Sequence, residues 1–184
     1  MSRRCLVNLS SATADPRVAQ AWQVLQGVPD PEVPAISVCE LGIVREVLVE
    51  DAGLHVVLTP TYSGCPATEV ITQSVLDALS AAGLGPARAT LQRQPAWTTD
   101  WISAEGRTKL LAYGIAPPGP TDPNVGAPVR FIARRPAGLA SSAIACPQCG
   151  STNTERLSAF GSTPCKALYR CMACREPFEH FKPI

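Results

Sequence analysis

The fold of this chain is decided by residues 54–83, which read LHVVLTPTYSGCPATEVITQSVLDALSAAG. The β-branched run from Leu54 to Thr59 predicts a strand. From Val70 onward apolar residues recur at intervals of three and four until Gly83, which is typical of an amphipathic helix. A strand, a short loop and a helix in this order indicate a layered α/β domain.

The neighbouring segments complete this domain. Leu41–Val49 predicts a second strand, joined to the first by Glu50–Gly53, which has the composition of a hairpin turn. Three further elements are expected: a helix from Asp15 and Pro16 to Gly27, a strand over Arg88–Arg93 and a helix over Ser103–Tyr113. We therefore expect an α+β fold in which residues 15–115 form a small α/β layered domain of about three strands and three helices.

The rest of the chain divides by composition. Residues 1–14 predict a flexible N-terminus without a secretory signal, because Asn8 and two serines interrupt its apolar stretch. Residues 116–143 are rich in proline, which predicts a linker, and residues 144–184 form a separate module. No run approaches the roughly 18 apolar residues of a membrane span. We therefore expect no membrane association and a cytoplasmic protein with reduced thiols.

The C-terminal module holds five of the eight cysteines. Two C-x-x-C pairs, with 21 residues between them, have the spacing of a metal site: Cys146, Cys149, Cys171 and Cys174. Such turns bring four thiolates to the corners of a tetrahedron, and four protein ligands leave no position for water. We expect a structural Zn²⁺ and a zinc ribbon. A rubredoxin-type iron site and disulfides remain alternatives.

Cys165 is the odd thiol of this module, and three roles are open for it: a fifth, exchangeable ligand, a reactive thiol or a buried residue. Basic and aromatic residues also alternate along the module, which is the pattern of some nucleic-acid-binding surfaces. These aromatic residues are equally suited to fill the small core of a ribbon. Because 16 basic and 15 acidic residues give the chain a net charge of only +1, we expect no nucleic-acid partner.

Candidate functional residues of the first domain lie in its loops. Pro66 suits the first position of a helix, so Cys65 is expected at the N-cap, where free N–H groups and the helix dipole stabilise a thiolate. Asp30 and Glu32 form a rigid acidic loop, which by itself indicates a solvated turn. Cys39 is expected to pack in the interior, and His55 to be a hydrogen-bonded residue of the sheet.

Three strings resemble a known domain: DPEVP at 30–34, ELGIVR at 40–45 and TPTYSGCP at 59–66. They are similar to the small α/β domain of iron–sulfur cluster assembly factors of the SufT type, and the resemblance covers roughly residues 15–115. In that family the cysteine of the Gly-Cys-Pro string is the functional thiol, which implies this role for Cys65. No role is implied for Cys39.

Two longer strings extend the resemblance over nearly the whole chain: PAWTTDW at 95–101, and FGSTPCKALYRC with REPF within 160–178. They are similar to the PaaD family, also called PaaJ, of the phenylacetate degradation pathway. Membership implies an accessory component of the multicomponent phenylacetyl-CoA 1,2-epoxidase. The oxygenase of that system is di-iron, and its reductase carries an iron–sulfur cluster and a flavin.

The expectation is therefore a non-enzymatic protein that helps to mature an iron–sulfur or di-iron centre of the oxygenase or reductase. Cys65, alone or with Cys165, would transiently hold iron or a cluster while the zinc ribbon docks the other epoxidase subunits. A stoichiometric structural subunit and a nucleic-acid-binding ribbon are the alternatives, and a homo-oligomer stays open. A thiol enzyme is disfavoured because the only two histidines, His55 and His180, have no evident pairing with Cys65.

Overall fold

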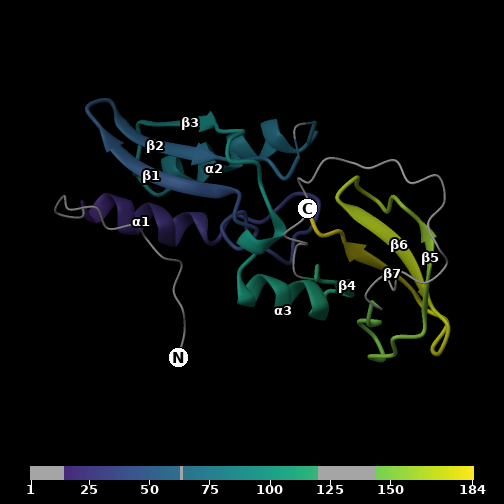
Figure 1. Cartoon of the computed structure of the whole chain (residues 1–184). Coiled ribbons are helices and arrows are strands. Elements are labelled where there is room, and N and C mark those ends of the chain that lie inside the picture. The colour runs from purple at the N-terminus through teal and green to yellow at the C-terminus, as the bar shows by residue number, and fades with distance from the viewer. Residues whose placement is uncertain (1–14, 63, 120–143) are drawn as a thin grey trace. The chain divides into compact units, whose positions relative to one another are not determined.

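The computed structural model describes residues 15–62, 64–119 and 144–184. The expected flexible N-terminus, 1–14, and most of the expected linker, 116–143, lie outside the described residues. The described part of the chain forms two compact units, one of residues 15–97 with 101–106 and the other of 98–100 with 107–119 and 144–184. Each unit has its own sheet (Figure 1).

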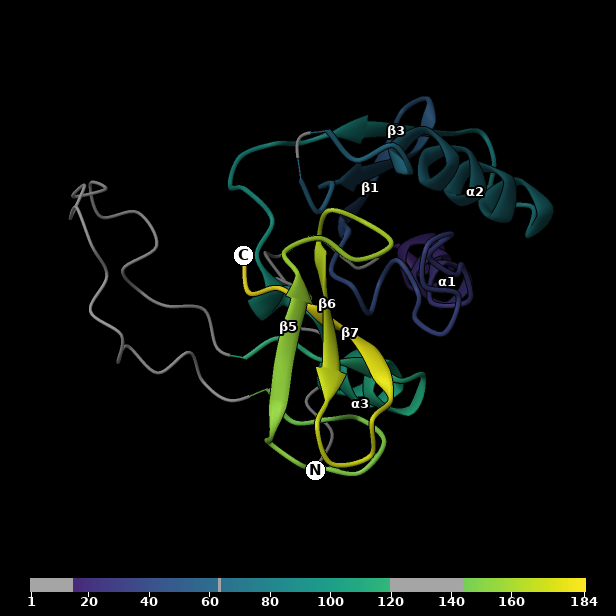
Figure 2. The same cartoon turned by 90° about the vertical axis from the view of Figure 1, so that its right-hand side faces the viewer.

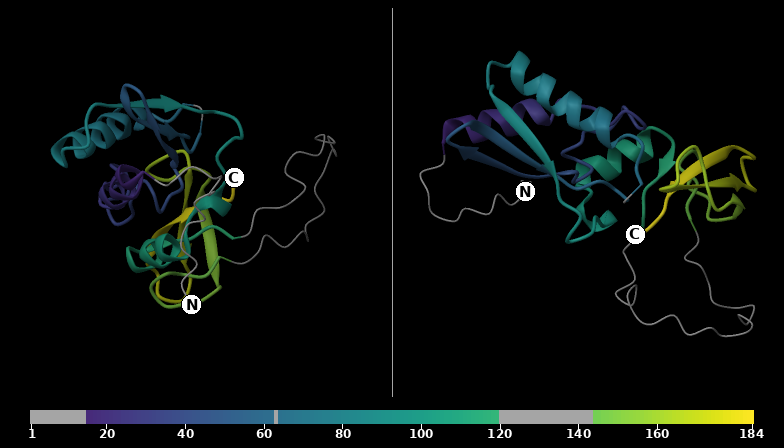
Figure 3. Two further views of the ribbon diagram at one scale, coloured as in Figure 1. Left: turned by 90° about the vertical axis from the view of Figure 1, so that its left-hand side faces the viewer. Right: turned by 90° about the horizontal axis from the view of Figure 1, so that it is seen from above.

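The first unit is a layered α/β domain as the sequence predicts, but residues 107–115, which the sequence assigned to it with a third helix, fall in the second unit. Its elements follow in the order α1 (Pro16–Leu25), β1 (Val44–Glu50), β2 (Gly53–Leu58), α2 (Thr68–Ala81) and β3 (Ala87–Leu91). Strands β1 and β2 are antiparallel, whereas β2 and β3 are parallel and are connected through α2. Helix α1 packs on β1 and helix α2 on β3, and both cover the same face of the sheet (Figures 2 and 3).

The core of this unit lies between the two helices and the sheet. Asp15 caps α1 by accepting a hydrogen bond of 2.9 Å from the backbone N–H of Arg17, and Pro16 occupies the first turn, as expected. The apolar stripes of the helices and one side of β2 are almost completely buried: Ala21, Leu25, Ile71, Val75, Leu79, Leu54, Val56 and Leu58. Burial of these side chains supplies the main driving force for folding.

Strand β1 begins at Val44 rather than at Leu41, because a tight turn precedes it. Gly42 has a φ of +72°, and a Cβ there would lie 2.7 Å from Cβ of Trp101, so no larger residue fits. Trp97 donates from Nε1 to the carbonyl of Leu41 at 3.0 Å. The guanidinium of Arg45 lies 3.5 Å from the ring centroid of Trp101. The two tryptophans of the PAWTTDW string therefore hold this turn in place.

The chain passes from the first unit to the second in residues 98–107. This part contains a 3₁₀ turn (Thr99–Trp101) and the start of helix α3 (Ala104–Ala112). The second unit has the strands β4 (Ile115–Ala116), β5 (Thr154–Ser158), β6 (Lys166–Cys171) and β7 (Pro177–Phe181). Their order in the sheet is β4-β7-β6-β5. The two residues of β4 run parallel to β7, a pairing that no sequence pattern indicated.

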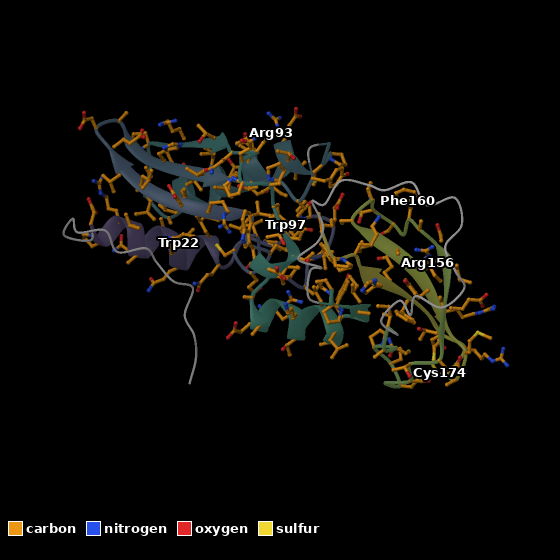
Figure 4. All side chains as sticks on the ribbon, viewed as in Figure 1. Trp22, Arg93, Trp97, Arg156, Phe160 and Cys174 are labelled. Atoms are coloured by element: carbon orange, nitrogen blue, oxygen red, sulfur yellow. The ribbon has the colours of Figure 1, made fainter. Side chains whose placement is uncertain are left out.

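Strands β5, β6 and β7 form the zinc ribbon, with the cysteine turns at one end and the loop 159–165 at the other. Figure 4 shows Cys174 and Phe160 at these opposite ends, with Arg156 between them. Tyr169 stacks on the buried Phe178 with ring centroids 5.8 Å apart, as expected for aromatic residues of a small core. Phe160 does not follow this expectation, because 64% of it is exposed. Within the described residues, no helix has the length and apolar character to cross a bilayer.

Candidate functional site

The first candidate site is the loop after β2, which contains Cys65. Thr59 at its start is buried and donates from its N–H to the carbonyl of Ile43 at 2.8 Å, which ties the loop to the start of β1. The N–H of Cys65 donates to the carbonyl of Tyr62 at 3.2 Å. Cys65 itself is half-buried, and within the described residues its sulfur has no hydrogen bond.

Cys65 is not the N-cap of α2, which corrects the expectation from the sequence. The carbonyl of Cys65 accepts both the N–H of Thr68, at 3.3 Å, and its hydroxyl, at 2.8 Å. These bonds close a turn over Pro66 and Ala67, so the helix begins at Thr68 and its N-cap is Ala67. Proline is common both in turns of this kind and at the first position of a helix. The sequence therefore could not tell whether Pro66 belongs to a turn or to the helix. Cys65 precedes the helix by three residues, and within the described residues no helix N–H donates to its sulfur.

The acidic loop lies at the same end of the sheet, but Asp30 is not solvated as expected. Its side chain is buried, and Oδ1 accepts the backbone N–H groups of Glu32 at 2.9 Å and Val33 at 2.8 Å. Glu32 is half-buried. Asp30 therefore fixes the backbone of its own loop, in the manner of an Asx turn.

A chain of backbone hydrogen bonds links the acidic loop to the Cys65 loop. The N–H of Val38 donates to the carbonyl of Val28, and the carbonyl of Val38 in turn accepts the N–H of Ile43. The carbonyl of Ile43 accepts the N–H of Thr59. Both loops thus rest on one rigid scaffold where β1 begins and β2 ends.

The other candidates of this unit behave as expected. His55 lies with Nδ1 3.0 Å from Oε1 of Glu50 and Nε2 2.7 Å from Oγ1 of Thr90, so both of its ring nitrogens have partners within the sheet. Arg88 donates to both carboxylate oxygens of the same Glu50. Cys39 is buried. Of the cysteines described in the first unit, Cys65 is the accessible one.

The second candidate site is the four-cysteine cluster of the ribbon. The sulfur atoms of Cys146, Cys149, Cys171 and Cys174 all lie within 4.8 Å of one another. The Sγ atoms are 3.7 Å apart between Cys146 and Cys174, and 3.6 Å apart between Cys149 and Cys171. A tetrahedral zinc with Zn–S bonds of about 2.3 Å requires sulfur atoms roughly 3.8 Å apart. The donor set fits Zn²⁺, and these separations exclude the disulfide alternative.

The surroundings of the cluster also favour metal binding. The backbone N–H of Cys174 donates to Sγ of Cys171 at 3.5 Å, and this bond lowers the pKa of the Cys171 thiol, whereas at Cys174 a backbone bond from Glu176 is outweighed by burial and the neighbouring thiols, which raise the pKa of Cys174. A lower pKa favours the thiolate that zinc requires. Cys146 and Cys171 are buried against Ala116 and Phe178, which shields one side of the site from water. When zinc is bound there, it cross-links the two cysteine turns.

Cys165 does not belong to this cluster. Its sulfur lies 3.0 Å from Oγ1 of Thr163 in the loop at the opposite end of the ribbon, and only 5% of the residue is exposed. Of the three roles left open by the sequence, the buried one fits these contacts.

Comparisons with known proteins assign both units. The model of the family described as "Iron-sulfur cluster assembly protein" matches residues 19–90, and that of the "PaaD zinc beta ribbon domain" matches residues 134–182. A protein of Escherichia coli, provisionally named as a subunit of 1,2-phenylacetyl-CoA epoxidase, is 42% identical over 171 residues, which cover 93% of this chain and 96% of that relative. The chain belongs to the PaaD family.

Two other relatives match about half of this PaaD family member. The "Fe-S protein maturation auxiliary factor" of Porphyromonas gingivalis is 32% identical and covers 48% of the chain and 85% of its own length. The factor of the same description from Bacillus subtilis, YitW, is 35% identical and covers 50% of the chain and 87% of its own length. The iron–sulfur assembly match includes Asp30, Glu32 and Cys65, and the PaaD ribbon match includes the four zinc cysteines. The ribbon family, named for zinc, decides against the rubredoxin alternative.

His180 in strand β7 makes the stability of the ribbon dependent on pH. Only 4% of it is exposed, its ring meets Tyr169 edge-on, and within the described residues its Nε2 has no hydrogen-bond partner. Burial lowers the pKa of His180 from 6.5 to about 4. Between these values the unfolded chain binds a proton that the folded ribbon does not, so stability falls as the pH falls from 6.5 towards 4.

We expect the ribbon to lose about 3 kcal/mol of unfolding free energy from this group across that window. Chemical unfolding at pH 7 and pH 5.5, with the zinc content checked at both, measures the first part of this loss, about 1 kcal/mol. The variant His180→Phe is the control, because protonation of the zinc thiolates affects both proteins equally. An identical pH dependence in the two proteins would show that His180 does not contribute.

Proposed function

We propose that this chain is a non-catalytic accessory factor that matures an iron–sulfur or di-iron centre of a phenylacetyl-CoA 1,2-epoxidase. The observation that carries the proposal is the accessible thiol of Cys65, in the part of the chain that matches iron–sulfur assembly proteins. The whole-chain relative, named as a subunit of that epoxidase, supports the choice of client. A cytoplasmic location belongs to the proposal, because thiols and zinc thiolates persist in a reducing compartment.

A single accessible thiolate suits the transfer of a metal rather than its permanent binding. Iron and iron–sulfur clusters are held in proteins by several soft sulfur ligands, so one ligand from Cys65 binds weakly. In the transfer step the bond from Cys65 sulfur to iron breaks as a ligand of the client, a cysteine in an iron–sulfur centre or a carboxylate or histidine in a di-iron one, bonds the iron and releases any proton it carries to water. Cys39 and Cys165 are both buried, so the proposal rests on Cys65 alone.

The contacts of the two histidines support a non-catalytic role. A nucleophilic cysteine requires a base that takes up its proton, most often a histidine. His55 has its ring nitrogens engaged by Glu50 and Thr90, and His180 is buried in the other unit. The stoichiometric structural subunit remains the second candidate, because the relative that covers 93% of the chain is named a subunit.

Metal analysis of the epoxidase from a strain lacking this protein tests the proposal. We expect its oxygenase and reductase to be present and assembled, but to contain at least several-fold less iron in one centre than the same subunits from a complemented strain. Iron and acid-labile sulfide per purified subunit are the quantities to measure. Equal iron and sulfide contents in the two strains would contradict a maturation role and favour a structural one.

A further inference from the structure

The loop 159–165, at the end of the ribbon away from the zinc site, presents an apolar surface. Phe160 is 64% exposed and Leu157, which precedes it in a bulge of β5, is 48% exposed. The ammonium group of Lys182 lies 4.6 Å from the ring centroid of Phe160 and also donates to the carbonyl of Ala159 at 3.3 Å. The side chain of Phe160 thus points to solvent with the ammonium of Lys182 against its ring, instead of contributing to the core of the ribbon.

The loop is tied to the sheet by an ion pair between a buried lysine and a partly buried glutamate. Nζ of Lys166 lies 2.8 Å from Oε2 of Glu179, and the side chain of Lys166 is only 3% exposed. Glu179 also accepts hydrogen bonds from the backbone N–H and the hydroxyl of Ser162. Burial alone raises the pKa of Glu179, but the bonds from Lys166 and Ser162 outweigh it and keep the pKa below its usual range. Glu179 therefore stays charged and ties the loop to β7.

These features argue for a preformed contact surface. An aromatic ring that stays exposed contributes little hydrophobic stabilisation to the fold, and an ion pair with a buried lysine is often no more stabilising than the apolar residues that could replace it. A loop that is rigid before binding loses little conformational entropy when a partner covers it. An exposed aromatic anchor on a fixed loop is the usual form of a binding hot spot.

The charges indicate what kind of partner fits. In the ribbon, Lys166 and Arg170 are paired with Glu179 and Glu155. Within the described residues Lys182, whose ammonium lies 4.6 Å from the ring centroid of Phe160, has no carboxylate partner, so the uncompensated charge beside this ring is positive. We propose that Leu157, Phe160 and Lys182 form a docking surface for an acidic protein segment carrying an apolar side chain, supplied by the subunit that receives the metal. This inference rests on the proposed function.

A nucleic acid fits the surface less well than an acidic protein segment. Binding of a phosphate backbone requires a row of cations, and residues 144–184 carry five basic and three acidic residues, two of the basic ones already paired. One exposed ring also gives a stacking platform for a single base only.

Titration of the full chain with the purified iron-free oxygenase and, separately, the iron-free reductase tests the surface. We expect one of them to bind, and Phe160→Ala to raise the dissociation constant about 30-fold. Lys182→Gln should raise it about threefold and weaken its dependence on salt. Tyr113→Ala is the matched control, because Tyr113 is an equally exposed aromatic residue, at 57%, at the end of α3, and should bind as the wild type does. A zinc content of one per chain in each variant shows that the ribbon is folded.

Each other outcome overturns a defined part of the account. If the wild-type chain binds and Phe160→Ala binds equally well, the docking surface is wrong while the maturation function stands. If neither subunit binds the wild-type chain, both are wrong. Binding of a 20-nucleotide single strand at 150 mM salt that depends on Phe160 would replace the protein segment by nucleic acid. If binding depends on Phe160 but deletion leaves the iron content of the epoxidase unchanged, the surface stands and the maturation function fails.

Discussion

Replacing Cys171 by serine is expected to unfold the ribbon and leave residues 15–97 folded. Zinc binding to four thiolates contributes about 10–16 kcal/mol in isolated zinc fingers, which is as large as the entire stability of a typical domain. The ribbon cannot replace this contribution, because the buried cluster at its cysteine turns consists of Ala116, Phe178 and cysteines with Ile144 and Tyr169 packed against it, and Ala167 and Phe181 are the other buried apolar residues of strands β5–β7. The core of the first unit, formed by α1, α2 and the sheet, does not include the metal.

Zinc content and residue-resolved amide exchange measure this effect. The variant should contain less than a tenth of the wild-type zinc, and the amides of β5–β7 should lose protection while those of α2 keep it. Cys165→Ser is the matched control: it changes a thiol of the same ribbon that is no zinc ligand, and it should retain the metal. A Cys171→Ser protein with one tightly held zinc and a protected ribbon would contradict the four-thiolate site.

Replacing Cys65 by serine is expected to abolish the contribution of the protein to epoxidase activity without unfolding it. The sulfur is half-buried and has no hydrogen bond within the described residues, so the substitution should change the unfolding free energy by no more than about 0.5 kcal/mol. A hydroxyl is a far poorer ligand for iron than a thiolate. We therefore expect at least a tenfold loss of phenylacetyl-CoA turnover in cells.

Growth on phenylacetate of a deletion strain carrying the variant is the simplest readout. Cys165→Ser should restore growth, because Cys165 is buried and belongs to the other unit. Full growth with Cys65→Ser, together with failure of Cys165→Ser, would transfer the functional role to the ribbon thiol.

The elements of the fold follow from the sequence wherever a periodic pattern runs for several residues. The stripe of α2 and the β-branched run of β2 were long enough to locate both elements, and Asp15 marked the start of α1. The start of β1 was placed three residues too early. The turn at Gly42 that delays the start of β1 packs against Trp101, which lies 59 residues later in the chain. No local sequence pattern indicates a contact over that separation.

In the candidate sites, too, features set by a local pattern could be predicted and features set by distant contacts could not. The zinc cysteines could be predicted because two C-x-x-C turns carry their geometry in their spacing. The place of Cys65 before α2 could not be predicted, because a turn and a first helical position accept the same Cys-Pro dipeptide. The burial of Asp30 accompanies a loop closed by Val28 and Val38, and Phe160 lies in a loop whose Ser162 is bonded to Glu179 of a different strand. Both are tertiary effects.

The central claim is that this protein acts during the biogenesis of the epoxidase and is not needed afterwards. Its most direct test is the turnover of phenylacetyl-CoA by oxygenase and reductase purified from a strain that contains this protein, measured without it and then with increasing amounts added back. Maturation predicts full turnover without the protein and no increase on addition. A negligible rate that rises to saturation at one equivalent of added protein would contradict the claim and make the chain a structural subunit.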